Sequence, residues 1–160
     1  MISVVISDVI KYKATIMNRI INIPNVLELI NDEAVTEPIQ LRDNNVFRYL
    51  KIPNTTTKVK NYICFDFNSR KSRVNKVYKD VVINVFIICH ESDINTPWGA
   101  RHDVLSGLII NDFNWSDFLG FELELDSDSE DILQTEYHIR KLQFKNRTTD
   151  SFSNKVHYND

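Results

Sequence analysis

The segment HESDINTPWGARHD, residues 90–103, concentrates the side chains best suited to chemistry. Five of its residues offer imidazole or carboxylate groups: His90, Glu91, Asp93, His102 and Asp103. These groups suit Zn²⁺ or Mn²⁺, so a metal-dependent hydrolase or nuclease is one function to weigh. A helical zinc pair needs ligands about four residues apart on one face, whereas only His102 is expected on a helix and Ser106 follows it at that spacing. The spacing therefore favours a loop and a helix start, with Glu91 and Asp93 near the positive end of the helix dipole.

Other catalytic chemistries find less support. The chain has no G-x-S-x-G motif, and its three glycines are too few for a phosphate-binding loop. Cys64 and Cys89 lie in apolar, strand-like runs without metal-ligand spacing, which predicts buried free thiols. We therefore expect a protein that is not an enzyme and needs no metal or other cofactor.

The N-terminal part is predicted to be helical. SDVIKYKATIMNRIINI places apolar residues at helical spacing, with Ser7 or Asp8 as the N-cap. In IPNVLELINDE, Pro24 either starts a second short helix or kinks the first. Residues 34–58 have no clear period and are read as an extended connector, with VFRYLKI as a candidate strand.

A β-hairpin is expected next, formed by NYICFDFN and KVYKDVVINVFIICH around a basic loop. The second strand alternates an apolar set with a mixed one. The apolar set is Val81, Ile83, Val85, Ile87 and Cys89, and the mixed set is Asp80, Val82, Asn84, Phe86 and Ile88. One face should therefore be buried throughout, and the other only toward the end of the strand.

A central helix and a second hairpin complete the predicted fold. TPWGARHDVLSGLIINDF reads as a helix with Thr96 at the N-cap and Pro97 at the first helical position. FELELD reads as a strand, SDSED as a polar turn and LQTEYHIRKLQF as the partner strand. The prediction is an α+β fold in the order helix, hairpin, helix, hairpin, with N-terminal helices and a central helix on a mostly antiparallel four-stranded sheet. Residues 1–150 form its single domain, and residues 151–160 a polar C-terminal tail.

Composition is consistent with one soluble domain. The chain has 160 residues, of which 42% are hydrophobic, enough for a core of its own. No run approaches the ~18 apolar residues of a membrane span, and no targeting peptide is recognised. We expect a cytosolic location and no membrane partner.

Charge is unevenly distributed, although the net charge is only −3. Residues 58–79 are strongly basic, and residues 122–131 are acidic without a cation. The segment DSDSED lacks the glycine of a calcium-binding EF-hand loop. The basic loop could contact a nucleic-acid backbone, but the chain as a whole is acidic.

The two charged hairpins are also complementary surfaces on identical copies. Such a contact is head to tail and can close into a ring. The residues assigned to this hypothetical subunit interface are Arg70, Lys71, Arg73, Lys76, Glu122, Glu124, Asp126 and Asp128. The alternative is that both hairpins are simply solvated.

Taken together, the elements resemble the tail terminator (tail completion) proteins of tailed bacteriophages across residues 2–150. The resemblance rests on the helix VIKYKATIMNRIINI, the hairpin around NYICFDFN and YKDVVINVFIICH, the helix ARHDVLSGLI and the closing strand YHIRKLQFKNRTTD. Head-completion and adaptor proteins of the phage neck share parts of this plan. The long connector, residues 34–58, departs from the compact version and leaves open which surface meets the tail tube.

The resemblance implies a non-catalytic structural protein of the virion. It implies a homo-oligomeric ring, by likeness a hexamer, that terminates the tail tube and joins it to the head connector. Its partners would be the tail tube protein and connector or adaptor proteins, with nucleic acid met only in the ring lumen. It would assemble in the host cytoplasm and remain in the phage neck.

Overall fold

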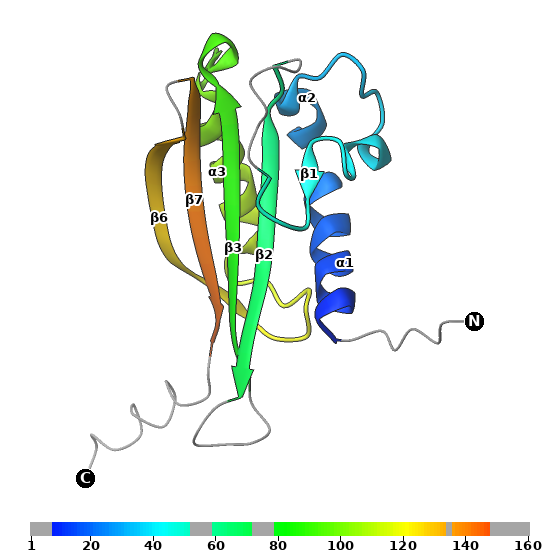
Figure 1. The fold of residues 1–160 in the computed structure, drawn as a ribbon. Coiled ribbons are helices and arrows are strands. Elements are labelled where there is room, and N and C mark those ends of the chain that lie inside the picture. Colours follow the sequence, from blue (N-terminus) through cyan, green and yellow to red (C-terminus); the bar gives the residue numbers. More distant parts are fainter. Residues whose placement is uncertain (1–7, 52–58, 72–78, 134–135, 148–160) are drawn as a thin grey trace.

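The computed structural model describes residues 8–51, 59–71, 79–133 and 136–147, and for residues 70, 71 and 79 it describes the backbone alone. Helices cover one face of a long β-sheet (Figure 1). The helices are α1 (Asp8–Ile21), α2 (Val26–Ile30) and α3 (Arg101–Phe113), with short 3-10 turns η1 (Pro38–Leu41) and η2 (Glu91–Asp93). The long strands are β2 (Tyr62–Lys71), β3 (Lys79–His90), β6 (Leu123–Leu133) and β7 (Tyr137–Asn146). None of the helices described has the length and apolar character to cross a membrane.

The α+β class and the order of the long elements agree with the prediction, but the sheet differs from it. The main sheet has five strands in the order β1-β2-β3-β7-β6, because β1 (Val46–Phe47) adds to β2 in parallel. Val46 and Phe47 are buried, and the amide of Ile63 donates to the carbonyl of Asn45 at 2.7 Å. The predicted four-stranded sheet is therefore a mixed five-stranded one, because the connector contributes a short buried strand although most of its described residues are exposed.

The N-terminal helices form as the apolar spacing predicts. The second half of α1 buries Ile16, Met17, Ile20 and Ile21, whereas the exposed Val9 and Ile10 lie in its first turn. A separate α2 follows because Asn25 adopts φ 73°, a left-handed conformation that no helix can continue through.

Strand β3 lies at the centre of the sheet, between β2 and β7. Its set Val81, Ile83, Val85, Ile87 and Cys89 is buried in the main core beneath the helices. On the other face only Ile88 is fully buried, in a second cluster with Phe47, Tyr62, Cys64 and Tyr137. The prediction that this face becomes apolar toward the strand end is confirmed.

The central helix begins later than predicted. Asn95–Thr96 (β4) and Gly99–Ala100 (β5) form a two-stranded ribbon, and α3 starts at Arg101 with Ala100 as its N-cap. The Thr96 hydroxyl donates to the carbonyl of Gly99 at 2.7 Å and does not cap a helix. Gly99 has φ 137°, which a helix cannot contain, so Thr96 and Pro97 fall outside α3.

The acidic segment SDSED is part of a strand, not a turn. β6 continues through it to Leu133 and pairs with β7 along its length, with a bulge between Leu125 and Ser127. Polar side chains are tolerated because β6 is the outer strand, where charges also discourage unwanted edge pairing. The turn that follows includes residues 134–135, which lie outside the described residues, as does the predicted tail at 151–160.

Candidate functional site

The polar residues of segment 90–103 do not converge on one point. His90 ends β3, with its Nδ1 atom 2.7 Å from the Ser92 hydroxyl and its Nε2 atom 3.5 Å from a Glu136 carboxylate oxygen. Asp93 faces Arg101 instead, and His102 faces β6. The segment therefore contributes to separate polar groups and does not form the single metal site that was considered.

Arg101 is the centre of the first group and is only 7% exposed. Its Nη1 donates to the Leu29 carbonyl at 2.6 Å and its Nε to the Asp93 carbonyl at 2.7 Å, while Nη2 lies 3.1 Å from Asp93 Oδ1. Asp93 also accepts from the side-chain amides of Asn31 and Asn61. These bonds tie α2, the start of β2 and the start of α3 together, which is a structural role.

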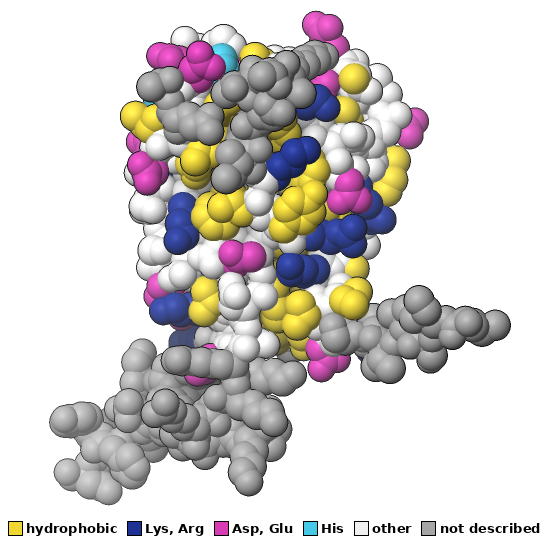
Figure 2. Space-filling view, in the orientation of Figure 1, with side chains coloured by type: hydrophobic (Ala, Val, Ile, Leu, Met, Phe, Trp, Pro, Cys, Tyr) yellow, Lys and Arg dark blue, Asp and Glu magenta, His cyan; other side chains and the backbone are white. Residues whose placement is uncertain are grey.

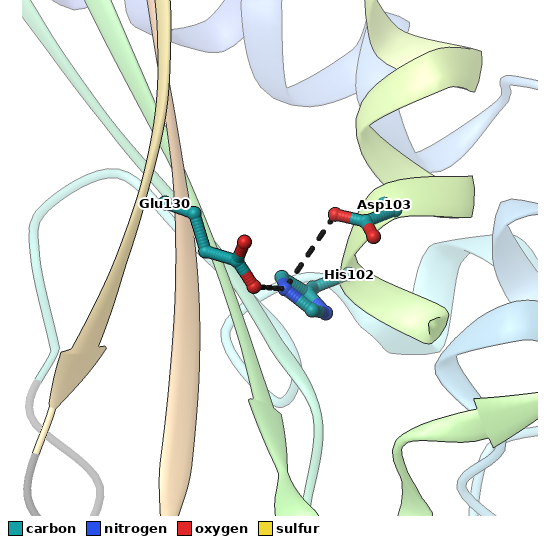
Figure 3. A group of neighbouring side chains, drawn as sticks. All are labelled: His102, Asp103 and Glu130. Carbon is teal, nitrogen blue, oxygen red and sulfur yellow. Dashed lines mark hydrogen bonds and ion pairs between the residues drawn. The ribbon is translucent and has the colours of Figure 1, made fainter. Parts of the chain in front are cut away.

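The second group, which we call the α3–β6 network, comprises His102, Asp103, Asp128, Glu130 and Arg140. His102 is 2% exposed, and its Nε2 lies 2.7 Å from Glu130 Oε1 and 3.5 Å from Asp103 Oδ1 (Figure 3). Arg140 on β7 donates to Asp103 at 3.0 Å and to both oxygens of Asp128 at 2.7 and 3.1 Å. The network thus joins the first turn of α3 to β6, the outer strand, and to its neighbour β7.

The charges of this network shift the affinity of its groups for protons. The hydrogen bond from His102, reinforced by the charge of His102, lowers the pKa of Glu130. The hydrogen bond to Asp128, with the charges of that and the neighbouring carboxylates, raises the pKa of Arg140. Both shifts favour the ionised forms, as expected for a mutually neutralising cluster.

His102, Asp103 and Glu130 are the one group in the described part of the chain whose ligand atoms could surround a metal ion, all lying within 4.8 Å of one another. Two features oppose a metal there. Arg140 already places a cation against Asp103, and 3.9 Å from Glu130. A metal on Nε2 would also leave the imidazole proton on Nδ1, which is buried without a hydrogen-bond partner among the described residues. The arrangement fits an ion-pair network better than a hydrolytic centre.

Sequence reasoning missed Glu130 and Arg140 as partners of His102 and Asp103. These contacts could be predicted only from the correct register between β6 and β7, which places Glu130 directly opposite Arg140. Reading SDSED as a turn shifts that register, so the pairing of acids on one strand with cations on the next was hidden.

The predicted acidic interface residues lie along the outer edge of the sheet, not at a hairpin tip. Within the same subunit, Glu122 pairs with Arg147 at 3.3 Å, Asp126 with Lys145 at 3.1 Å and Asp128 with Arg140 at 2.7 Å. Glu124 is exposed and makes no ion pair within the described residues. Because the segment is a paired strand, it also lacks the loop that a calcium site of the EF-hand type requires.

The predicted basic hairpin forms a ribbon beyond the sheet. The last pair between β3 and β7 is Val82 with Lys145, whereas β2 and β3 continue to pair from Ser69–Val81 as far as Lys71–Lys79. The backbone of Arg70 and Lys71 belongs to this ribbon, while Arg73 and Lys76 lie outside the described residues.

Of the aromatic residues next to the basic hairpin, the two that the structure describes do not offer a stacking platform for nucleic acid, and Tyr78 lies outside the described residues. Phe65 and Phe67 are buried in the main core.

Cys64 and Cys89 are buried free thiols, as predicted. Burial raises the pKa of Cys64 to about 11 and also raises that of Cys89, so neither thiol is a candidate nucleophile.

Comparison with known proteins shows the family of the chain. A family model described as YomW matches residues 13–146. The chain belongs to the YomW family. This family carries a phage-derived gene name of the Bacillus phage SPBc2 type, which supports a bacteriophage protein without specifying a place in the virion. No curated protein matches the chain. The YomW match covers the whole sheet, α3 and the α3–β6 network.

Proposed function

We propose that the chain is a structural protein of the phage neck that forms a ring, terminates the tail tube and joins it to the head connector. The phage-derived name of the family supports a bacteriophage protein. The order helix, hairpin, helix, hairpin, which resembles the tail terminator proteins, supports the position.

The observation that carries the proposal is the ribbon that β2 and β3 form beyond β7. Three residue pairs of this ribbon extend past the last ladder pair between β3 and β7, and the Val81 amide of the first still donates to Asn146 Oδ1 at 2.9 Å. A two-stranded ribbon is only marginally stable by itself, and its open edges can pair or pack against another chain. A projecting basic ribbon is therefore well suited to contact a neighbouring copy or the next protein of the neck.

A non-catalytic role agrees with the side chains available. The acids nearest His102 are engaged with Arg140, and both thiols are buried. We propose that the ring is a hexamer, that its partners are the tail tube protein and connector or adaptor proteins, and that it occupies the virion after assembly in the host cytoplasm.

The proposal can be tested in the phage that encodes the chain, by introducing a stop codon at an early position. A tube that lacks its terminator should keep growing, so electron microscopy should show overlong tails that are detached from filled heads. Supplying the chain from a plasmid should restore joined particles, and symmetry averaging should place its density in a ring at the neck.

Other outcomes separate the alternatives. Tails of normal length beside heads that have lost their DNA would favour the head-completion or adaptor role. Normal, joined particles without the chain would refute a neck function of either kind.

A further inference from the structure

Figure 2 shows basic side chains gathered on the side of α1 and β1, with acidic ones among them. On the side of α1 and β1 lies a surface that we call the cationic flank, made of Lys13, Arg42, Arg48, Tyr49, Leu50 and Lys51. On the opposite side, β6 carries an acidic edge, which we define as Asp126, Asp128, Glu130 and Asp131 with the serines between them. The first three also make ion pairs within the subunit, whereas Asp131 makes none among the described residues. We propose that the cationic flank of one copy receives the acidic edge of the next. This inference rests on the proposed ring.

The cationic flank is a coherent surface. Lys13 Nζ donates to the Arg48 carbonyl at 2.8 Å, which holds α1 against the segment that follows β1. Lys51 lies over the ring of Phe47, with Nζ 4.4 Å from the ring centroid. Arg48 makes only a long, exposed ion pair with Asp43, at 3.6 Å. Cations therefore remain available to an acidic partner.

Both surfaces also carry exposed apolar side chains. On the cationic flank, Tyr49 is 57% exposed and Leu50 47% exposed. On β6, Ile132 is 61% exposed. Subunit interfaces combine such apolar contacts with a charged rim, and tyrosine is enriched in them. A contact between these surfaces would bury the apolar groups and bring opposite charges together.

The register of the sheet places the two surfaces at the same level along the strand direction. Along one line across the sheet, Phe47 is paired with Cys64, Cys64 with Phe86, Phe86 with Lys141 and Lys141 with Ser129. Surfaces on opposite edges and at one level suit a head-to-tail contact that can repeat around a ring. The basic ribbon instead lies at the end of the sheet (Figure 1), which leaves it free for a different contact.

Disulfide trapping tests the geometry. Tyr49→Cys and Ser129→Cys are combined in one chain, where the two positions lie at opposite edges of five strands. Adjacent strands are about 4.8 Å apart, so the distance between positions 49 and 129 within one copy far exceeds the roughly 7 Å between Cα atoms that a disulfide can span. A disulfide can therefore form only between copies. The native thiols are buried and should not form disulfides under mild oxidation.

Mild oxidation of assembled rings should produce a ladder of covalent oligomers, and each single-cysteine variant should remain monomeric. A comparison chain with Ser69→Cys and Ser129→Cys reports the contact that the basic ribbon would make. Rings that yield the ladder only from this comparison chain would overturn the inference and leave the proposed ring standing. Absence of any ring, in particles and in solution, would remove the proposed function itself.

Charge reversal tests the contact between the cationic flank and the acidic edge independently of disulfide trapping. Arg48→Glu and Asp131→Lys should each raise the concentration needed for assembly at least roughly tenfold, because like charges then face each other. The double variant should recover most of the loss, and Glu33→Lys, the reversal of an exposed acid that belongs to neither surface, should change little. Circular dichroism checks that each variant folds. Unchanged assembly in both folded single variants would overturn the inference.

Discussion

The Nε2 atom of His102 lies 2.7 Å from the Oε1 atom of Glu130, and this bond joins the first turn of α3 to the outermost strand. His102 is buried, whereas Glu130 is exposed. A buried imidazole is thus held by a carboxylate at the surface. Arg140 also donates to the neighbouring Asp103, so this carboxylate already has a cation beside it.

The first prediction concerns metal binding. Adding Zn²⁺ or Mn²⁺ should leave the thermal midpoint of the wild-type protein unchanged, because Arg140 and the unpaired Nδ1 of His102 both disfavour an ion. His102→Ala, the control, should lower stability by about 1–3 kcal/mol through loss of a buried side chain. A metal-dependent rise in the midpoint that disappears in His102→Ala would restore the metal-dependent alternative.

The second prediction concerns pH. Glu130 has a pKa below its ordinary value of 4.5 in the folded protein, so its contribution to stability is present above that value and is lost as pH falls through the folded pKa. Urea unfolding followed below pH 5 should therefore show a loss of stability that is smaller in Glu130→Gln. Glu33→Gln serves as the exposed control. Identical acid profiles for wild type and Glu130→Gln would show that the bond to His102 does not contribute.

The third prediction concerns Arg101. Replacing it with alanine leaves the Leu29 carbonyl and Asp93 without their charged donor, so we expect a loss of about 2–3 kcal/mol in the free energy of unfolding. Arg19→Ala is the matched control, since its pair with Asp112 is exposed and should cost no more than about 1 kcal/mol. Equal effects of the two substitutions, measured by urea denaturation, would argue against a structural role for Arg101.

The fourth prediction concerns the basic hairpin. A contact of this hairpin with acids of the next copy is the alternative to the contact through the cationic flank. If it forms, replacing Arg70, Lys71 and Arg73 together with glutamate should block assembly, and reversing Glu122, Glu124 and Asp128 as well should partly restore it. Analytical ultracentrifugation measures both. A nucleic-acid binder would instead lose DNA or RNA binding in the first variant and regain nothing in the second. A hairpin that is only solvated would leave assembly and binding unchanged.

The local spacing of apolar residues predicted much of the fold. The apolar spacing of α1, the two unequal faces of β3 and the burial of both cysteines were all readable, because burial along a single helix or strand repeats with its own geometry.

The candidate site was decided by tertiary structure. His102 meets a residue 28 positions away, and Asp103 meets Arg140 across 37 positions. Both contacts depend on the register between β6 and β7 and on where α3 begins, and the latter depends on the conformation of Gly99. The sequence by itself determined most of the long helices and strands and which of their faces are apolar, but not the start of α3 or the length of β6. Only the packing of those segments decided which charges neutralise each other and which edges stay open, because such pairings depend on distances between segments that no local pattern encodes.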